Sequence, residues 1–304
     1  MFREVVLGLG NNAAVSGVVK RYGMSLGASR FVAGDSLSSA VPVCQDLNRR
    51  GIAVTLDHLG ESVRDEPAAI AAKDSYLEIL QTIAEKGLKA NVSLKLTMMG
   101  LALSVDLARS NLAAVVETAA GFNNFVRIDM EDSPYTSITI DLFEEVWEKF
   151  PGHVGLVLQS YLYRTQDDLK RLSEPPKNFR IVKGAYRESV AVAFPSKPDV
   201  DDNYVELVRQ SLELGNMTAI ATHDEVIIGR VLKYLKSHQV LPEQFEFQML
   251  YGVKLGVLEE LAKEGYRTRV YVPYGQDWYA YYVRRIAERP ANLLFFARAL
   301  IDRR

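Results

Sequence analysis

A chain of 304 residues that is 48% hydrophobic and 24% charged has the length and composition of a globular protein with a full buried core. Its formal charge of −2 shows no excess of positive charge that would indicate binding to nucleic acid or another polyanion. The single cysteine, Cys44, excludes an intramolecular disulfide and favours a reducing compartment such as the cytoplasm. We expect neither a secretory signal nor a membrane span, because no apolar run reaches the required length. Peripheral contact with the inner face of the cell membrane stays open.

The first 50 residues precede any strand-like segment. Two segments with apolar residues at helical spacing, 13–31 and 37–51, are expected to form short helices that pack against the rest of the chain. Residues 8–13, GLGNNA, imitate the glycine-rich turn of dinucleotide-binding folds, but no clear second strand follows, so we give this motif little weight. We therefore expect one domain, with an N-terminal helical extension over 1–50 and a larger α/β unit over 51–304.

From residue 51 onward, short apolar or β-branched segments alternate with helical ones. Eight segments have the nearly continuous apolar core of parallel strands covered on both faces. They are 52–60, 89–100, 125–132, 153–162, 179–186, 217–224, 245–252 and 268–275. Eight strand–helix units predict a closed (β/α)8 barrel of the TIM type. A doubly wound open sheet would show the same alternation, but the number of units favours closure.

Three of the intervening helices have clear sequence signals. The segment 71–89 is amphipathic, and Gly87 is placed to end its helix in a left-handed turn. The segment 107–122 has the same helical period. In 141–152 we expect Asp141 to begin a helix and Pro151 to stop it.

Polar residues lie near the carboxyl ends of the predicted strands, where (β/α)8 barrels carry their active sites. A buried charge costs several kcal/mol unless it is paired, so these residues need partners or a ligand. Lys95 alternates with Leu94 and Leu96 and is expected to point into the barrel, with Asp129 as its carboxylate partner. A purely structural Lys95–Asp129 pair is the alternative, and His223 could equally be a satisfied core histidine. The other polar strand-end residues are Asp57, His58, Glu61, Glu131, Asp132, Gln159, Arg180, Lys183, Tyr186, Thr222, Asp224, Gln248, Tyr251, Tyr271 and Tyr274.

The segment YYVRRIAERPAN, residues 281–292, places two adjacent arginines on a helix after the last strand. Arg284 and Arg285 lie four and three residues before Glu288, and Pro290 should end or kink the helix. Apolar residues on both sides indicate that the helix is largely buried; a solvated helix face is the alternative. Arginine binds carboxylates in a planar, bidentate manner. The segment therefore suggests a small carboxylate ligand under a helix that caps the barrel mouth.

Taken together, these motifs resemble the FAD-dependent proline dehydrogenase family, in its single-domain bacterial form and as a domain of bifunctional proline utilisation enzymes. The matching segments occur in the family's order over roughly residues 30–300. They are TLDHLGES, SLKLT, RIDMED, VLQSYL, RIVKGAY, ATHD, FQMLYGV, YVPYG and YYVRRIAERPAN. A departure is Arg187, which follows VKGAY where some relatives carry an aromatic residue; we assign it no role.

The resemblance implies a distorted (β/α)8 barrel with FAD at the carboxyl ends of the strands. It implies oxidation of L-proline to Δ1-pyrroline-5-carboxylate, with electrons passed to a membrane quinone. The implied substrate residues are Lys95, Asp129, Tyr186, Leu250, Tyr271, Arg284 and Arg285, with Glu61 as a gate that pairs with Arg284. The implied cofactor residues are Gln159, Arg180, Val182, Lys183, Gly184, Ala185, Thr222, His223 and Glu288, with Arg180 near the reactive edge of the flavin.

Two other hypotheses compete with a flavoenzyme: a metal-dependent barrel hydrolase and a carboxylate-binding barrel without chemistry. The four histidines lie far apart and lack zinc-ligand spacings, so we expect no metal site. No residue stands out as a general base for the proline nitrogen, and no motif indicates an oligomeric state.

Overall fold

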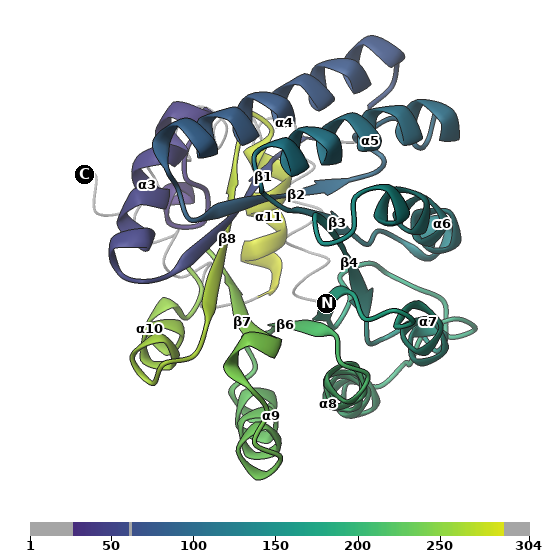
Figure 1. The fold of residues 1–304 in the computed structure, drawn as a ribbon, viewed down its shortest axis with the longest axis vertical. Helices are drawn as coiled ribbons and strands as arrows, with labels where there is room; N and C mark the ends of the chain where they lie inside the picture. Colours follow the sequence, from purple (N-terminus) through teal and green to yellow (C-terminus); the bar gives the residue numbers. More distant parts are fainter. Residues whose placement is uncertain (1–26, 61–62, 289–304) are drawn as a thin grey trace.

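In the computed structural model, which describes residues 27–60 and 63–288, eight parallel strands form a closed barrel in sequence order (Figure 1). The strands are β1 (Ala53–His58), β2 (Ala90–Lys95), β3 (Val126–Asp129), β4 (Val154–Gln159), β5 (Asn178–Val182), β6 (Met217–Ala221), β7 (Phe245–Leu250) and β8 (Thr268–Tyr274). Seven of the eight predicted strand segments contain one of them, and β5 begins one residue before its predicted segment, 179–186. Closure comes from β1 and β8, where Thr55 lies in register with Tyr271, so the open-sheet alternative is wrong.

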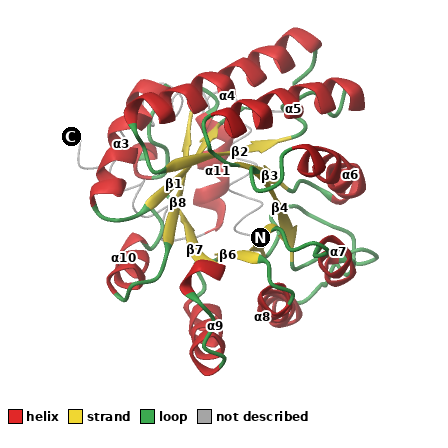
Figure 2. Ribbon diagram, in the orientation of Figure 1, coloured by secondary structure: helices red, strands yellow, loops and turns green. Residues whose placement is uncertain are grey.

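Helices surround the barrel on the outside, except for the last one, α11, which lies over the middle of the ring of strands (Figure 2). They are α3 (Leu37–Arg49), α4 (Glu66–Lys86), α5 (Val105–Gly121), α6 (Ser133–Lys149), α7 (Thr165–Leu172), α8 (Lys197–Glu213), α9 (Glu225–Ser237), α10 (Leu255–Lys263) and α11 (Trp278–Glu288). Two short 3-10 turns, η1 (Ala28–Arg30) and η2 (Pro242–Gln244), complete the described elements. The helix expected over 37–51 is therefore present, whereas most of 13–31 and the GLGNNA motif lie outside the described residues. The division into an extension over 1–50 and a barrel over 51–304 stays a prediction.

The helix ends agree with the sequence signals in two cases and differ in a third. Gly87 closes α4 with a φ of 59°, and α6 ends at Lys149, two residues before Pro151. The predicted start of α6 at Asp141 is wrong, because the helix begins at Ser133. An earlier start signal was missed: Asp132 is extended and Pro134 occupies the first turn, where its missing N–H costs nothing.

The two faces of the strands have opposite character. Apolar side chains such as Val54, Leu56 and Leu94 belong to the main hydrophobic core of the protein, and all three are fully buried. The alternate residues face the barrel interior, and many of them are polar: Thr55, for example, donates a 2.6 Å hydrogen bond to Asn91 Oδ1. Buried polar groups require partners, so this interior is a hydrogen-bonded network rather than an apolar filling.

The last helix, α11, lies at the carboxyl ends of the strands, as predicted. Its residues Trp278, Tyr281 and Tyr282 pack in a second hydrophobic cluster with Leu59, which directly follows β1. Val253, from the loop after β7, packs against the same cluster. These contacts place α11 over the barrel mouth, and the view in Figure 1 shows it projecting over the middle of the ring of strands.

Candidate active site

Asp129, the last residue of β3, is the centre of a group of charged and hydroxyl side chains. Its Oδ1 accepts hydrogen bonds from Ser93 Oγ at 2.7 Å and Arg180 Nη1 at 2.8 Å. Its Oδ2 accepts one from the Tyr271 hydroxyl at 2.7 Å and lies 3.5 Å from Lys95 Nζ. We call these five residues the Asp129 cluster. They come from four different strands, so only the closed barrel brings them together.

The charges of the Asp129 cluster stabilise one another. Burial raises the pKa of the Asp129 carboxyl. The adjacent Lys95 and Arg180 lower this pKa by more than burial raises it, so it lies below the ordinary value. Burial lowers the pKa of Lys95, yet two neighbouring carboxylates, Asp57 and Asp129, raise it above the ordinary value. Lys95 is therefore held as an ammonium group, and Asp129 as a carboxylate, at neutral pH.

Asp57 is a second acidic partner of Lys95, to which sequence analysis gave no role. Its Oδ1 lies 3.6 Å from Lys95 Nζ, and its side chain is only 2% exposed. Burial raises the pKa of Asp57, and Lys95 opposes that shift. The relevant signal is the register of β1 on β2, which pairs Asp57 with Ser93 and brings it beside the Asp129 cluster.

Arg180 is held on two sides within the barrel. Its Nε donates to Gln248 Oε1 at 2.6 Å, and its Nη1 donates to Ser93 Oγ at 3.2 Å as well as to Asp129. The guanidinium carbon lies 5.3 Å from the centre of the Tyr271 ring, within the range of a cation–π contact. Arg180 is therefore a buried cation with a fixed orientation.

Three of the predicted substrate residues lie around this group: Leu250 ends β7, Tyr271 lies within β8, and Tyr186 is in the loop after β5. Burial, with Asp129 as the next contribution, raises the pKa of Tyr271 well above the ordinary value, so its phenol stays neutral and donates to Asp129. Tyr186 is 37% exposed, and burial raises its pKa to about 12. Leu250 donates its backbone N–H to His223 Nε2 at 2.9 Å. His223 thus has a structural partner at the end of β7.

Most of the predicted cofactor residues lie at or just after the carboxyl ends of β4, β5 and β6. Gly184 has a φ of 116°, and a Cβ there would lie 2.5 Å from the Tyr161 ring, so only glycine fits this backbone. Lys183 Nζ lies 3.0 Å from Asp224 Oδ2 and 2.5 Å from Asp201 Oδ1. Val182 ends β5, and Ala185 follows Gly184 in the loop. These contacts fix the loop after β5 against the start of α9.

Gln159, at the end of β4, and Thr222, just after β6, are two further predicted cofactor residues. The Gln159 amide nitrogen lies 3.5 Å from the Met130 carbonyl, whereas its buried Oε1 makes no hydrogen bond to any residue that the structure describes. Thr222 Oγ1 accepts the Asp224 N–H at 3.1 Å. A buried acceptor without a partner is costly, so Gln159 is suited to a ligand that carries an N–H group.

The adjacent arginines lie on α11. Arg284 is exposed, and its positive charge is close enough to Tyr186 to oppose the rise of that pKa. Arg285 is half-buried, with its guanidinium carbon 5.1 Å from the centre of the Tyr281 ring. Glu61 and the side chain of Glu288 lie outside the described residues, so the predicted gate between Glu61 and Arg284 stays a prediction.

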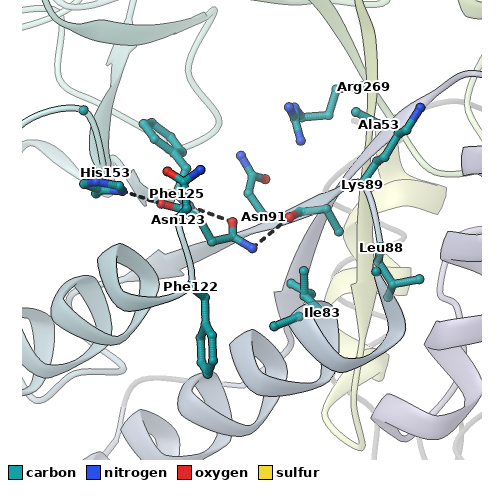
Figure 3. A pocket seen from close by; sticks show the side chains of 15 residues that line it. Ala53, Ile83, Leu88, Lys89, Asn91, Phe122, Asn123, Phe125, His153 and Arg269 are labelled. Carbon is teal, nitrogen blue, oxygen red and sulfur yellow. Dashed lines mark hydrogen bonds between the residues drawn. The ribbon is translucent and has the colours of Figure 1, made fainter.

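A separate hollow of about 580 Å³ lies at the opposite, N-terminal ends of the strands (Figure 3). Its lining includes Lys89, Asn91, Asn124, His153 and Arg269. None of the predicted site residues lines it, so it is distinct from the candidate active site. No group of three or more acidic, histidine or cysteine side chains within residues 27–60 and 63–288 is placed to hold a metal ion. No helix in the same ranges combines the length and apolar composition needed to cross a membrane.

Comparison with known proteins identifies the family. The family model described as proline dehydrogenase matches residues 40–298. Proline dehydrogenase 1 of Bacillus subtilis is 44% identical over 303 residues, which cover 100% of both chains. Proline dehydrogenase of Deinococcus radiodurans is 41% identical over 99% of this chain and 98% of that protein. In the crystal structure of proline utilization A from Bdellovibrio bacteriovorus, the matching region has a TM-score of 0.82 and 27% identity; it covers 90% of this chain and 34% of that one. The chain belongs to the proline dehydrogenase family.

Proposed function

We propose that this protein oxidises L-proline to Δ1-pyrroline-5-carboxylate with FAD and passes the electrons to a membrane quinone. Members of its family are oxidoreductases of proline catabolism, which makes the hydrolase and binding-protein alternatives unnecessary. The observation that carries the proposal is the Asp129 cluster, because it presents two fixed cations, Lys95 and Arg180, at the mouth of the barrel. A substrate carboxylate and an electron-rich ring both require such cations.

For the substrate, we infer that Lys95, Arg284 and Arg285 bind the proline carboxylate. Charge-assisted hydrogen bonds from several donors would fix its orientation. The proline ring would lie against Tyr271, Tyr186 and Leu250. Asp129 would act on the substrate indirectly, since it holds both the Tyr271 hydroxyl and the Lys95 ammonium. In the same proposal Glu61 and Arg284 pair over the occupied pocket and exclude water.

For the cofactor, three features of the predicted cofactor residues fit a flavin. Gln159 offers a buried acceptor, Gly184 lets the backbone approach a ligand closely, and Arg180 supplies a fixed cation. FAD, when bound, would supply the redox chemistry by accepting a hydride from the proline ring. Arg180 would stabilise the negative charge that develops at that point, because a fixed donor needs no reorganisation. The remaining residues proposed to hold the cofactor are Val182, Lys183, Ala185, Thr222, His223 and Glu288.

A quinone acceptor dissolves in the bilayer, so the proposal includes peripheral contact with the inner face of the cell membrane from the cytoplasm. Membrane vesicles that contain quinone should accept electrons from the enzyme in the presence of L-proline. If vesicles with and without quinone support the same turnover, the acceptor is a different one.

The test of the function itself is spectroscopic. The purified protein should be yellow, and its oxidised flavin band should bleach when L-proline is added without oxygen. D-Proline, which has the same chemical groups and the opposite configuration at its α-carbon, is the matched control. A colourless protein that takes up no FAD would overturn the proposal.

A further inference from the structure

A line of polar side chains crosses the barrel interior beneath the Asp129 cluster. Arg269 Nε lies 2.7 Å from Glu246 Oε1, and Arg269 Nη2 donates to Glu246 Oε2 at 3.3 Å. Arg269 Nη1 donates to the Val54 carbonyl at 2.7 Å. The Gln248 amide nitrogen donates to Glu246 Oε1, and Gln248 Oε1 accepts from Arg180 Nε at 2.6 Å. We call Arg180, Gln248, Glu246 and Arg269 the interior polar chain; it ends at the hollow in Figure 3, where Arg269 contributes to the lining.

The orientation of the Gln248 amide follows from the charge of Glu246. A side-chain amide has a donor on one side and an acceptor on the other. Glu246 is only 4% exposed, and its burial raises the pKa, but Arg269 lowers it to about 2. The ionised carboxylate can only accept hydrogen bonds, so the nitrogen of Gln248 must face Glu246. The oxygen of Gln248 is then the atom that faces Arg180 Nε.

This orientation fixes the plane of the Arg180 guanidinium. Its Nε is held by Gln248, and its Nη1 is held by Asp129 and Ser93. Its Nη2 makes no hydrogen bond to the part of the chain that the structure describes, and it is therefore the donor left for a ligand. If the Gln248 amide were reversed, two N–H donors would face each other and Arg180 would have to rotate.

We propose that Glu246 is a positioning residue for proline oxidation. It acts through Gln248, which orients the Arg180 guanidinium toward the negative charge that develops at the reactive edge of the flavin. The inference rests on the proposed function, since it takes Arg180 as the cation at the reactive edge of the flavin. A fixed donor stabilises developing charge more than a mobile one does. Displacement of such a group by about 1 Å costs about 100-fold in rate. Neither Glu246 nor Gln248 needs to touch the substrate for this effect.

A merely structural role for Glu246 makes a different prediction. If Glu246 only fills space and bonds to its neighbours, the isosteric variant Glu246→Gln should be tolerated better than the shortened Glu246→Asp. If its acceptor-only carboxylate sets the Gln248 amide, Glu246→Asp should retain more activity than Glu246→Gln, because a glutamine can also donate. The comparison of these two variants therefore separates the two roles.

The experiment compares Glu246→Gln, Glu246→Asp and Gln248→Leu with wild-type protein. Gln248→Leu leaves the Glu246–Arg269 ion pair in place, so this variant still tests the proposal if Glu246→Gln does not fold. Thr55→Val is the matched control: it removes a buried hydrogen bond to Asn91 in the same barrel interior, outside the interior polar chain. For each purified holoenzyme, we would measure the flavin content, the thermal midpoint, the midpoint potential of the flavin, and its rate of reduction by saturating L-proline without oxygen.

At equal flavin content, Glu246→Gln and Gln248→Leu should slow flavin reduction about 10- to 100-fold and make the flavin potential more negative. Glu246→Asp should retain more of the rate than Glu246→Gln, and Thr55→Val should change only the thermal midpoint. Wild-type rate and potential in Gln248→Leu, or a faster Glu246→Gln than Glu246→Asp, would overturn the inference. Failure of L-proline to reduce the wild-type flavin would instead overturn the proposed function, before any variant is compared.

Discussion

The Tyr271 hydroxyl donates a 2.7 Å hydrogen bond to Asp129 Oδ2, which joins β8 to β3 across the mouth of the barrel. The same carboxyl group lies 3.5 Å from Lys95 Nζ and accepts from Arg180 on its other oxygen. One side chain thus positions a phenol, an ammonium and a guanidinium. We propose that these contacts serve proline oxidation, so replacement of the residues that make them should change activity as well as stability.

Replacement of Asp129 with alanine should affect both stability and activity. Asp129→Ala leaves the half-buried Lys95 and the buried Arg180 without their shared carboxylate, and the loss of one partner from a buried ion pair costs roughly 3–5 kcal/mol. Thermal unfolding and steady-state kinetics would measure the two effects. Tyr271→Phe is the milder companion, because it removes only the hydroxyl and keeps the ring. An Asp129→Ala protein with wild-type melting temperature and wild-type rate would show that this carboxylate is dispensable.

Arg285 is expected to bind the proline carboxylate. Arg285→Met should raise KM for L-proline, and the loss of a charge-assisted hydrogen bond worth about 1.5–3 kcal/mol predicts a 10- to 100-fold lower kcat/KM. The FAD content should stay normal. Arg230→Met is a suitable control, because Arg230 pairs with Asp202 on the exposed side of α9. Unchanged kinetics in Arg285→Met would exclude this role.

The proposed gate between Glu61 and Arg284 calls for a double-mutant cycle. Glu61→Ala should weaken proline binding and slow flavin reduction, yet leave flavin occupancy intact. An exposed ion pair contributes only ~0–1 kcal/mol, whereas a pair over an occupied, drier pocket should contribute more. The combined variant Glu61→Ala/Arg284→Ala should then lose less than the sum of the single losses. Strict additivity would instead make Arg284 an independent carboxylate ligand.

The buried Glu246–Arg269 pair predicts how stability depends on pH. The pKa of Glu246 is lowered from 4.5 to about 2 in the folded protein, so the unfolded chain binds the proton more readily. The stabilising effect is therefore complete above pH 4.5 and is lost as pH falls from there toward 2, by roughly 3 kcal/mol in total. Denaturant unfolding between these pH values would show the slope. Glu246→Gln should have a flatter acid limb; parallel curves for the two proteins would contradict the assignment.

Local patterns predicted most of the fold because (β/α)8 barrels repeat one short unit. Each strand had its own apolar run, and Gly87 and Pro151 marked helix ends within a few residues. The start of α6 was wrong because Asp141 was preferred over the earlier signals at Asp132 and Pro134. These are local errors, and they leave the barrel unchanged.

Strand order alone predicted contacts of the candidate site only where neighbouring strands supplied both partners. Lys95 and Asp129 lie on adjacent strands in direct register, so their contact followed from strand order alone. Glu246 and Gln248 were different, because their effect on Arg180 depends on which side of β7 they face and on the distance across the barrel. The contact of Asp57 with Lys95 was missed because it depends on the register of β1 on β2, not only on the order of the strands. Such contacts depend on three-dimensional register rather than on spacing in the chain.

In the function that we propose, the Asp129 cluster holds L-proline for oxidation by a bound flavin. The most direct test is an anaerobic titration of the purified protein with L-proline, followed by trapping of the Δ1-pyrroline-5-carboxylate that forms. We expect the flavin band to bleach and about one equivalent of product to form per flavin reduced. A flavin band that stays oxidised, or one that bleaches without trapped product, would contradict the proposed function.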